Sequence, residues 1–182
     1  IRTAVATGSR VVAGNISRSR IGTIYEGDHS DLEGDPRFTS MDILDAMERE
    51  SIRDQLFISH CEMMPRGSLD PMIAIQLARD ASMAYAMLGE NHDTVSSQAV
   101  LLAGAFHVRH DFGVPRHLRH HDSEADMAVL QLMEVHPDLA PESVHSAVSS
   151  DQADYVWFTP AAPEEDYCAG FRAKASPSAN EG

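Results

Sequence analysis

One short segment of the chain concentrates side chains that can bind a ligand. It reads Gly104-Ala105-Phe106-His107-Val108-Arg109-His110-Asp111-Phe112-Gly113-Val114-Pro115. A histidine such as His107 can ligate a metal or exchange a proton near neutral pH, and Arg109 and Asp111 alternate with it along the chain. Gly104 allows the backbone to turn without steric cost. The alternative interpretation is a structural histidine bonded to a backbone carbonyl, with Arg109 in an ordinary ion pair.

The same region is basic within an acidic chain. The 182 residues carry a net charge of −14, yet three arginines and five of the ten histidines lie between positions 107 and 121. A local cationic cluster can hold carboxylates or the propionates of a porphyrin, whereas the alternative is a solvated helix face. His117 and His121 have the i, i+4 spacing of a metal pair, but the glutamate of a metalloprotease helix is missing, so we assign no metal site.

The elements that must position this segment follow from hydrophobic patterning. The apolar run Ala99–Ala103 predicts a buried strand of a parallel sheet, and ligands bind beyond the carboxyl ends of such strands. We therefore expect His107 to enter a ligand crevice. Three further segments are predicted as strands: Val11–Ala13, Ala128–Val135 and Tyr155–Phe158.

Helices are expected between these strands. Thr39 and Asp42 resemble a capping box for a helix that begins near Met41 and runs toward Leu56. Asp70 as N-cap and Pro71 as first residue predict a second helix that ends at Gly89. On that helix Arg79-Asp80 are polar amid alanine and methionine, and we expect them to face the sheet edge or to pair with other charges. Together these elements predict an α/β fold, a mostly parallel sheet flanked by helices.

Size, charge and cysteine content limit the possible classes. A mass of 19.9 kDa allows one domain. The acidic charge disfavours nucleic acid, and the apolar stretches are far shorter than the roughly 20 residues that span a bilayer. Residues 172–182 are rich in Ala, Ser, Pro, Asn and Gly, which predicts a disordered tail. Counting alone leaves Cys61 and Cys168 equally open as a disulfide or as two buried thiols.

Four blocks of the sequence resemble a known family. They are Ser59-His60-Cys61, the segment 76–84, the segment 101–115 and Asp154-Tyr155-Val156-Trp157-Phe158-Thr159-Pro160. In this order they resemble the ChaN-like haem-binding uptake proteins, and they cover most of residues 11–171. The resemblance implies a bacterial lipoprotein of iron and haem acquisition, with an α/β core related to the Tiki/TraB/erythromycin-esterase group. Gly104-Ala105-Phe106-His107 matches the second of that group's two Gly-x-x-His boxes.

The chain departs from the family pattern in two places. Ala105 stands where the family usually has Asn, which removes one polar group. The first box, Gly-Glu-x-His, has no counterpart at its expected place. Gly89-Glu90-Asn91-His92 has the same residue types, but it lies too close to the second box. We read that segment as a loop. We therefore expect residues 1–171 to be the C-terminal portion of a ChaN-like domain, with a sheet incomplete at its N-terminal side.

The resemblance also implies a ligand, a partner and a location. The cofactor is haem, and the residues expected to contact it are His107, Arg109, Gly104, Asp111 and His60. Arg109 would pair a propionate and His107 would ligate or hydrogen-bond the axial group. Family members hold haem through a tyrosine with dimerisation, so a haem-bound homodimer is expected, but no motif selects among Tyr25, Tyr85, Tyr155 and Tyr167.

The expected location is the periplasm or outer membrane, with membrane contact only through a lipid anchor. A metal-dependent hydrolase of the Tiki type is the alternative function. Export favours a Cys61–Cys168 disulfide, whose closure of a loop of about 100 residues would contribute about 4–5 kcal/mol in the chain-entropy model.

Overall fold

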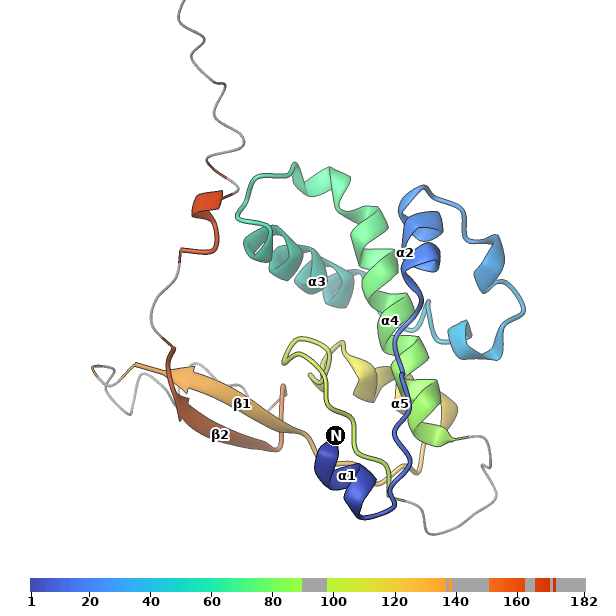
Figure 1. Cartoon of the computed structure of the whole chain (residues 1–182). Coiled ribbons are helices and arrows are strands. Elements are labelled where there is room, and N and C mark those ends of the chain that lie inside the picture. Colours follow the sequence, from blue (N-terminus) through green and yellow to red (C-terminus); the bar gives the residue numbers. More distant parts are fainter. Residues whose placement is uncertain (90–97, 137, 139–150, 163–165, 171, 173–182) are drawn as a thin grey trace, which may run out of the picture.

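Helices surround a central helix, and a small sheet lies beside them. The computed structural model describes residues 1–182 except 90–97, 137, 139–150, 163–165, 171 and 173–182. In chain order the elements are α1 (Arg2–Ala6), α2 (Arg18–Tyr25), α3 (Ala46–Ser59), α4 (Asp70–Leu88), α5 (Val114–His121), β1 (Leu130–Val135) and β2 (Tyr155–Pro160), with short 3-10 turns at Ser30–Leu32, Pro36–Phe38 and Arg66–Ser68. Helices α2, α3 and α5 pack against α4, and the sheet lies to their left in Figure 1.

Helix α4 is the core of the molecule because it is covered on several sides. Its interior holds no glycine, Pro71 occupies the first turn, and Gly89 ends it with a φ of +76°. The predicted helix is confirmed, although Leu69 is the N-cap and Asp70 is already helical. Three clusters of buried side chains form around it, and their α4 members are Ala78 and Ala81, then Ile73 and Leu77, then Met83 and Ala84.

Helix α3 begins later than predicted. The capping box is formed by Asp45 and Glu48, since the Asp45 side chain accepts from the Glu48 N–H and Glu48 Oε2 accepts from the Asp45 N–H at 2.8 Å. The prediction from Thr39 and Asp42 is wrong because Thr39 instead ends the 3-10 turn Pro36–Phe38. In a complete capping box, each of the two side chains accepts a hydrogen bond from a backbone N–H that has no partner within the helix. Asp45 and Glu48 form such a box, so the helix begins there.

The end of α3 carries a cysteine where glycine is usual. Cys61 and Glu62 have φ values of +61° and +58°, and the Glu62 N–H donates to the Phe57 carbonyl in a Schellman-type closure. A side chain in this left-handed conformation is unfavourable by about 1 kcal/mol or more. Cys61 is bonded to Cys168, 107 positions later, so the disulfide fixes the residue type at this turn.

The sheet is parallel, as predicted, and the α/β class is confirmed. β1 and β2 pair with Leu130 opposite Tyr155 and Leu132 opposite Trp157. Alternate residues of β1 are half-buried, whereas Leu130 and Leu132 are exposed together with Tyr155 and Trp157 across the register. Side chains alternate between the two faces of a strand, so this pairing creates one exposed apolar face.

Two predicted strands are wrong. Residues 11–13 and 99–103 are extended, but neither forms a strand with the described residues. In the second segment Leu101 and Ala103 pack against the α4–α5 cluster, while Val100 and Leu102 remain 85% and 83% exposed. The apolar pattern is that of a strand covered on both faces, but only one face is covered here and no strand hydrogen-bonds to its edge.

Some expectations concern residues that the structure does not describe. The predicted loop over 90–93 and all of the predicted tail except Arg172 lie outside the described residues. The assignment of residues 1–171 to the C-terminal portion of a domain stays a prediction. Among the described helices, none combines the length and apolar content needed to cross a membrane.

Loss of the disulfide should destabilise the chain. Replacing Cys61, Cys168 or both by Ala removes the same cross-link, so all three variants should lose about the same free energy of unfolding, about 4–5 kcal/mol in the chain-entropy model. Denaturant titrations with and without reductant measure this, and reductant should affect only the wild type. A double variant that loses the sum of the two single losses would contradict the role of the bridge.

Candidate functional site

A tight loop before α5 fixes the position of His107. Val114 N–H donates to the His107 carbonyl at 2.8 Å, and Gly113 N–H donates to the Arg109 carbonyl at 2.9 Å. A Cβ on Gly113 would lie 2.3 Å from the His107 carbonyl oxygen, so no other residue fits without rearrangement. Phe112, fully buried beneath the loop, contacts Phe106 with ring centroids 4.8 Å apart. The glycine and the aromatic pair therefore hold the loop closed.

His107 is joined to α4 by hydrogen bonds at one ring nitrogen. Its Nδ1 lies 2.5 Å from Asp80 Oδ1 and 2.7 Å from Gln76 Nε2, and Gln76 Nε2 also donates to Asp80 Oδ2 at 3.2 Å. Asp80 has no exposed surface, and its burial raises the pKa of its carboxyl to about 6 against the opposing effect of His107 and Gln76. A buried carboxylate thus orients a histidine.

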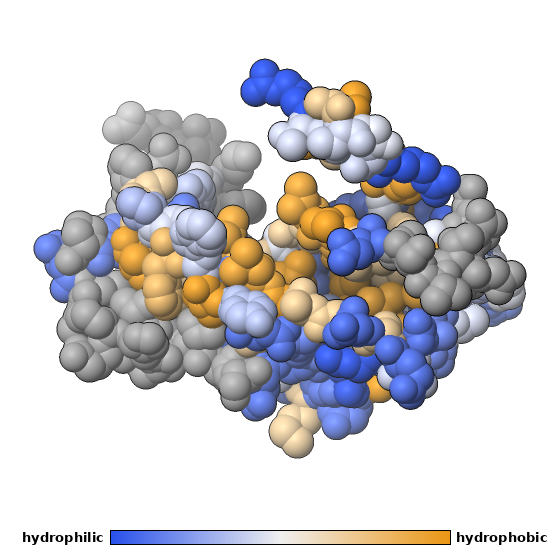
Figure 2. Space-filling view, turned by 90° about the horizontal axis from the view of Figure 1, so that it is seen from below, coloured by the Kyte–Doolittle hydropathy of each residue, from blue (hydrophilic) through white to orange (hydrophobic). Residues whose placement is uncertain are grey.

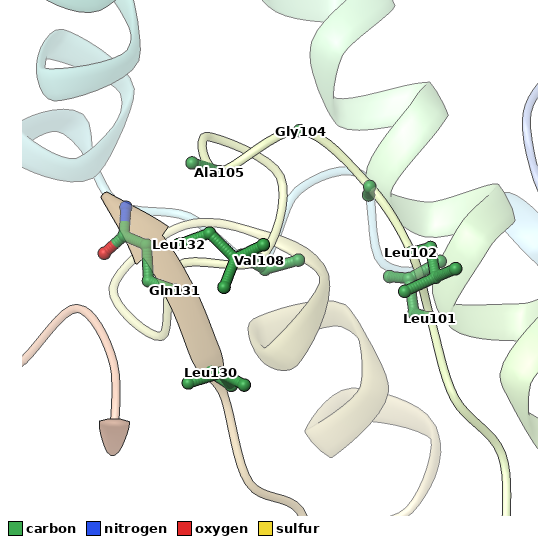
Figure 3. Close-up of a pocket in the computed structure, with 9 residues that line it drawn as sticks. Leu101, Leu102, Gly104, Ala105, Val108, Leu130, Gln131 and Leu132 are labelled. Carbon is green, nitrogen blue, oxygen red and sulfur yellow. The ribbon is translucent and has the colours of Figure 1, made fainter. Parts of the chain in front are cut away.

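Gly104, three residues before His107, lines an apolar pocket to which the His107 ring itself does not contribute. A Cβ on Gly104 would lie 3.8 Å from Cδ2, the ring carbon bonded to Nε2. The pocket has a volume of about 440 Å³, within the usual range for small-molecule sites. Figure 3 shows the extended segment with Leu101 and Leu102 on one side of it, and β1 with Leu130 and Leu132 on the other. The crevice therefore opens between this segment and β1, and not beyond the end of a sheet strand.

Two of the predicted contact residues pair with one another. The guanidinium of Arg109 binds Asp111 in a bidentate arrangement, Nε to Oδ1 at 2.9 Å and Nη2 to Oδ2 at 2.5 Å. It also lies over the ring of Phe112, with Cζ 4.2 Å from the ring centroid. The ion-pair alternative therefore describes Arg109 in this structure, and a contact of either residue with haem stays a prediction.

His60 is placed at the C-cap of α3. Its Nδ1 lies 2.8 Å from the Leu56 carbonyl and 3.2 Å from the Ser59 hydroxyl. None of the hydrogen bonds described for this ring links it to His107. The adjacent Cys61 is in the disulfide, so the Ser59-His60-Cys61 block holds a covalent cross-link.

The basic cluster is divided among separate partners. Arg116 forms an ion pair with Glu48 at 2.7 Å, and Arg119 contacts His110 at 3.3 Å. His110 Nε2 lies 2.8 Å from Asp154, whose pKa is lowered first by the Val129 N–H and then by His110. Carboxylates thus neutralise much of the local positive charge. The sequence alone did not identify these partners.

His117 is a core residue. It has no exposed surface, and its Nδ1 lies 2.8 Å from the equally buried Ser40 hydroxyl. Burial, followed by the charges of His121, His120 and Arg116, lowers the pKa of His117 to about 3. The described residues contain no cluster of three or more His, Cys, Asp or Glu side chains suited to a metal.

Asp80 and Gln76 are the site residues that the sequence reading missed. They lie one helical turn apart on α4. Polar residues with i, i+4 spacing share a face of a helix, so this spacing could have indicated that the two side chains act together. The pairing of Asp80 with another ionisable group was expected, but the partner, His107, is 27 positions away. Helical periodicity gives no information on such a contact.

The Asp80–His107 pair and the apolar pocket lie in an α/β domain. Residues 1–118 match the family described as haem-binding uptake proteins of the Tiki superfamily, ChaN, and the chain belongs to this family. The resemblance stated from the sequence is therefore confirmed.

One solved structure shares the fold. It is described as "Cofacial heme binding to ChaN of Campylobacter jejuni", with 24% identity and a TM-score of 0.59 over 81% of this chain. The match covers 50% of that protein, so the chain spans about half its length. None of the curated proteins compared with the chain matches it.

Acid should destabilise the fold through His117. Its pKa is about 3 in the folded chain and 6.5 ordinarily, so unfolding takes up a proton between these values and stability falls as pH drops below 6.5. The slope approaches about 1.4 kcal/mol per pH unit. Asp80 acts in the opposite direction between pH 6 and 3.8, because its raised pKa favours proton binding by the folded state.

The variant His117→Asn, which keeps a polar group near Ser40, isolates this effect. The difference in unfolding free energy between wild type and variant should shrink as pH falls from 6.5 toward 3. Denaturant titrations at several pH values measure it, and His29→Asn, at an exposed histidine that does not contribute to the lowered pKa of His117, is the matched control. Parallel pH curves for wild type and His117→Asn would contradict a neutral, buried His117.

Proposed function

We propose that the protein binds haem in an uptake system. The observation that carries this proposal is an apolar pocket lined by Gly104, three residues before His107, in a chain of this family. Haem is a flat apolar ring with an iron that accepts an axial nitrogen ligand. The pocket lining is apolar except for Gln131, and it includes Gly104, whose added Cβ would lie 3.8 Å from the His107 ring. The residues present therefore fit the group.

The contribution of the chain to binding can be stated residue by residue. Leu102, Leu130 and Leu132 would cover the macrocycle and exclude water from it. His107 would contact the iron or its axial group through Nε2, and Gly104 leaves the ring edge uncovered. Bound haem would supply the chemistry of an iron centre. We propose binding rather than hydrolysis, since the family description names binding and uptake.

We further propose that two copies associate when haem is bound. The apolar face of the sheet, formed by Leu130, Leu132, Tyr155 and Trp157, is exposed and continues into Leu102 across the pocket. Figure 2 shows hydrophobic side chains gathered across the middle of the face seen from below. Exposed apolar patches of this kind mark interaction sites. The solved relative is described as binding haem cofacially, which supports a shared interface.

We also propose that the protein works outside the cytoplasm, in the periplasm or at the outer membrane, anchored by a lipid. The Cys61–Cys168 disulfide supports this location, because such bonds persist in oxidising compartments. The family description as an uptake protein supports a role in iron acquisition.

Hemin titration tests the ligand. The wild type should show a saturable Soret shift, and His107→Ala should weaken the affinity tenfold or more, a loss of about 1.4 kcal/mol. His120→Ala removes an exposed histidine from α5 and should bind hemin like the wild type. Equal affinities for wild type and His107→Ala, or the lack of saturable binding, would refute the proposed site.

Sedimentation velocity tests the interface. Trp157→Asp places a charge on the apolar face and should prevent hemin-dependent dimerisation, because a charge is costly to bury without a partner. Met47→Asp introduces the same charge at an exposed position on α3 and should dimerise normally. A Trp157→Asp chain that still dimerises with hemin would place the interface elsewhere.

A further inference from the structure

Charge is distributed unevenly along this chain. Residues 1–25 contain four arginines and no acidic residue, so they contribute +4 to a net charge of −14 and the remaining residues contribute −18. We propose that residues 1–25, the basic arm, form a surface that lies against a bilayer with anionic headgroups. This contact goes beyond haem binding and does not depend on it, because the arm contributes no residue to the pocket lining.

The basic arm is held along one side of α4. Figure 1 shows α1, an extended segment and α2 following one another there. Gly14 allows a close approach, since a Cβ at this position would lie 3.3 Å from the side chain of Met83 on α4. Ile16 and Ile24 are buried in a cluster that includes Ala78 of α4. The arm is therefore a defined part of the molecular surface.

Two arginines of the arm lack the partners that most other arginines have. Beyond the arm, most described arginines form ion pairs with carboxylates, among them Arg37, Arg53, Arg66 and Arg109. Within the arm, Arg20 lies over the ring of Phe38 and reaches Asp35 at 3.8 Å. Arg2 and Arg18 are exposed, and neither forms an ion pair with a described residue. Their charge is available to an anionic partner.

Exposed apolar side chains lie between these arginines. They include Val5, Val11, Val12 and Tyr25. Segments that lie on a bilayer combine cations, which meet anionic headgroups, with apolar side chains, which enter the boundary of the acyl region. A purely acidic partner would leave these apolar side chains in water, so the combination favours a bilayer. The same anionic surface repels the acidic remainder of the chain, which orients the arm toward it.

Vesicle co-sedimentation of the whole chain tests this contact. The protein should bind vesicles of phosphatidylcholine mixed with phosphatidylglycerol, and it should not bind vesicles of phosphatidylcholine alone. Added salt should weaken the binding because it screens exposed charges. Replacing both Arg2 and Arg18 by Gln should weaken it about 30-fold, since two cations near the anionic surface are lost.

The matched control removes the same charge outside the arm. Arg66→Gln combined with Arg172→Gln alters two exposed arginines that are paired with carboxylates, and this variant should bind the vesicles like the wild type. Equal binding of the wild type to both kinds of vesicle would overturn the proposal. Equal losses of binding in the two double variants would overturn it too, because the arm would then have no special role.

The acidic remainder of a second copy is the alternative partner of the arm. Sedimentation velocity without vesicles or hemin, at low salt, should show no association that depends on Arg2 and Arg18. Association of the wild type that is lost in the Arg2→Gln, Arg18→Gln variant would overturn the bilayer contact in favour of a second copy. Hemin affinity of this variant should equal that of the wild type, so a failure of the membrane contact is distinguishable from a failure of haem binding.

Discussion

The hydrogen bond between Asp80 and His107 is the interaction on which the site depends. It joins the most buried helix to the loop before α5, which Gly113 and the Phe106–Phe112 pair also hold. Burial of a carboxylate is unfavourable, and the hydrogen bonds from His107 and Gln76 offset this cost. Removal of the Asp80 or the His107 side chain would leave a polar group of the other without its hydrogen-bond partner. The fold therefore constrains the site, and the site in turn stabilises the fold.

Two histidines ten positions apart show how tertiary environment separates chemical roles. His107 is bonded at Nδ1 by a carboxylate and is half-buried, whereas His117 is bonded by a hydroxyl and is enclosed on all sides. Burial keeps His117 neutral far below its ordinary pKa, so it serves as packing. The residue type alone does not distinguish a ligand from a core residue.

The pocket and the apolar face share one physical origin. The extended segment 99–103 covers the α4–α5 cluster with Leu101 and Ala103, and alternate residues of β1 are half-buried. Their other faces expose Leu102, Leu130 and Leu132 on either side of the pocket. Apolar surface of this kind is unfavourable in water, and a flat apolar ligand or a second protein surface would cover it. Ligand binding and association are therefore proposed for the same part of the molecule.

The sequence by itself determined α4 and predicted β1 and β2 as strands of a parallel sheet, because propensity, capping and alternation are local properties. It selected the loop at His107 as the candidate site. It also identified the family, through blocks in a fixed order. Only the tertiary structure decided that Asp80 and Gln76 hold His107, that Arg109 pairs with Asp111, and that His117 is buried. It also showed that residues 99–103 have no strand partner in the described part of the chain, since hydrogen-bonded pairing requires a neighbour that no local pattern reveals. Contacts between residues far apart in the chain depend on packing. Packing also decides the exposure of each histidine and which of its ring nitrogens is bonded.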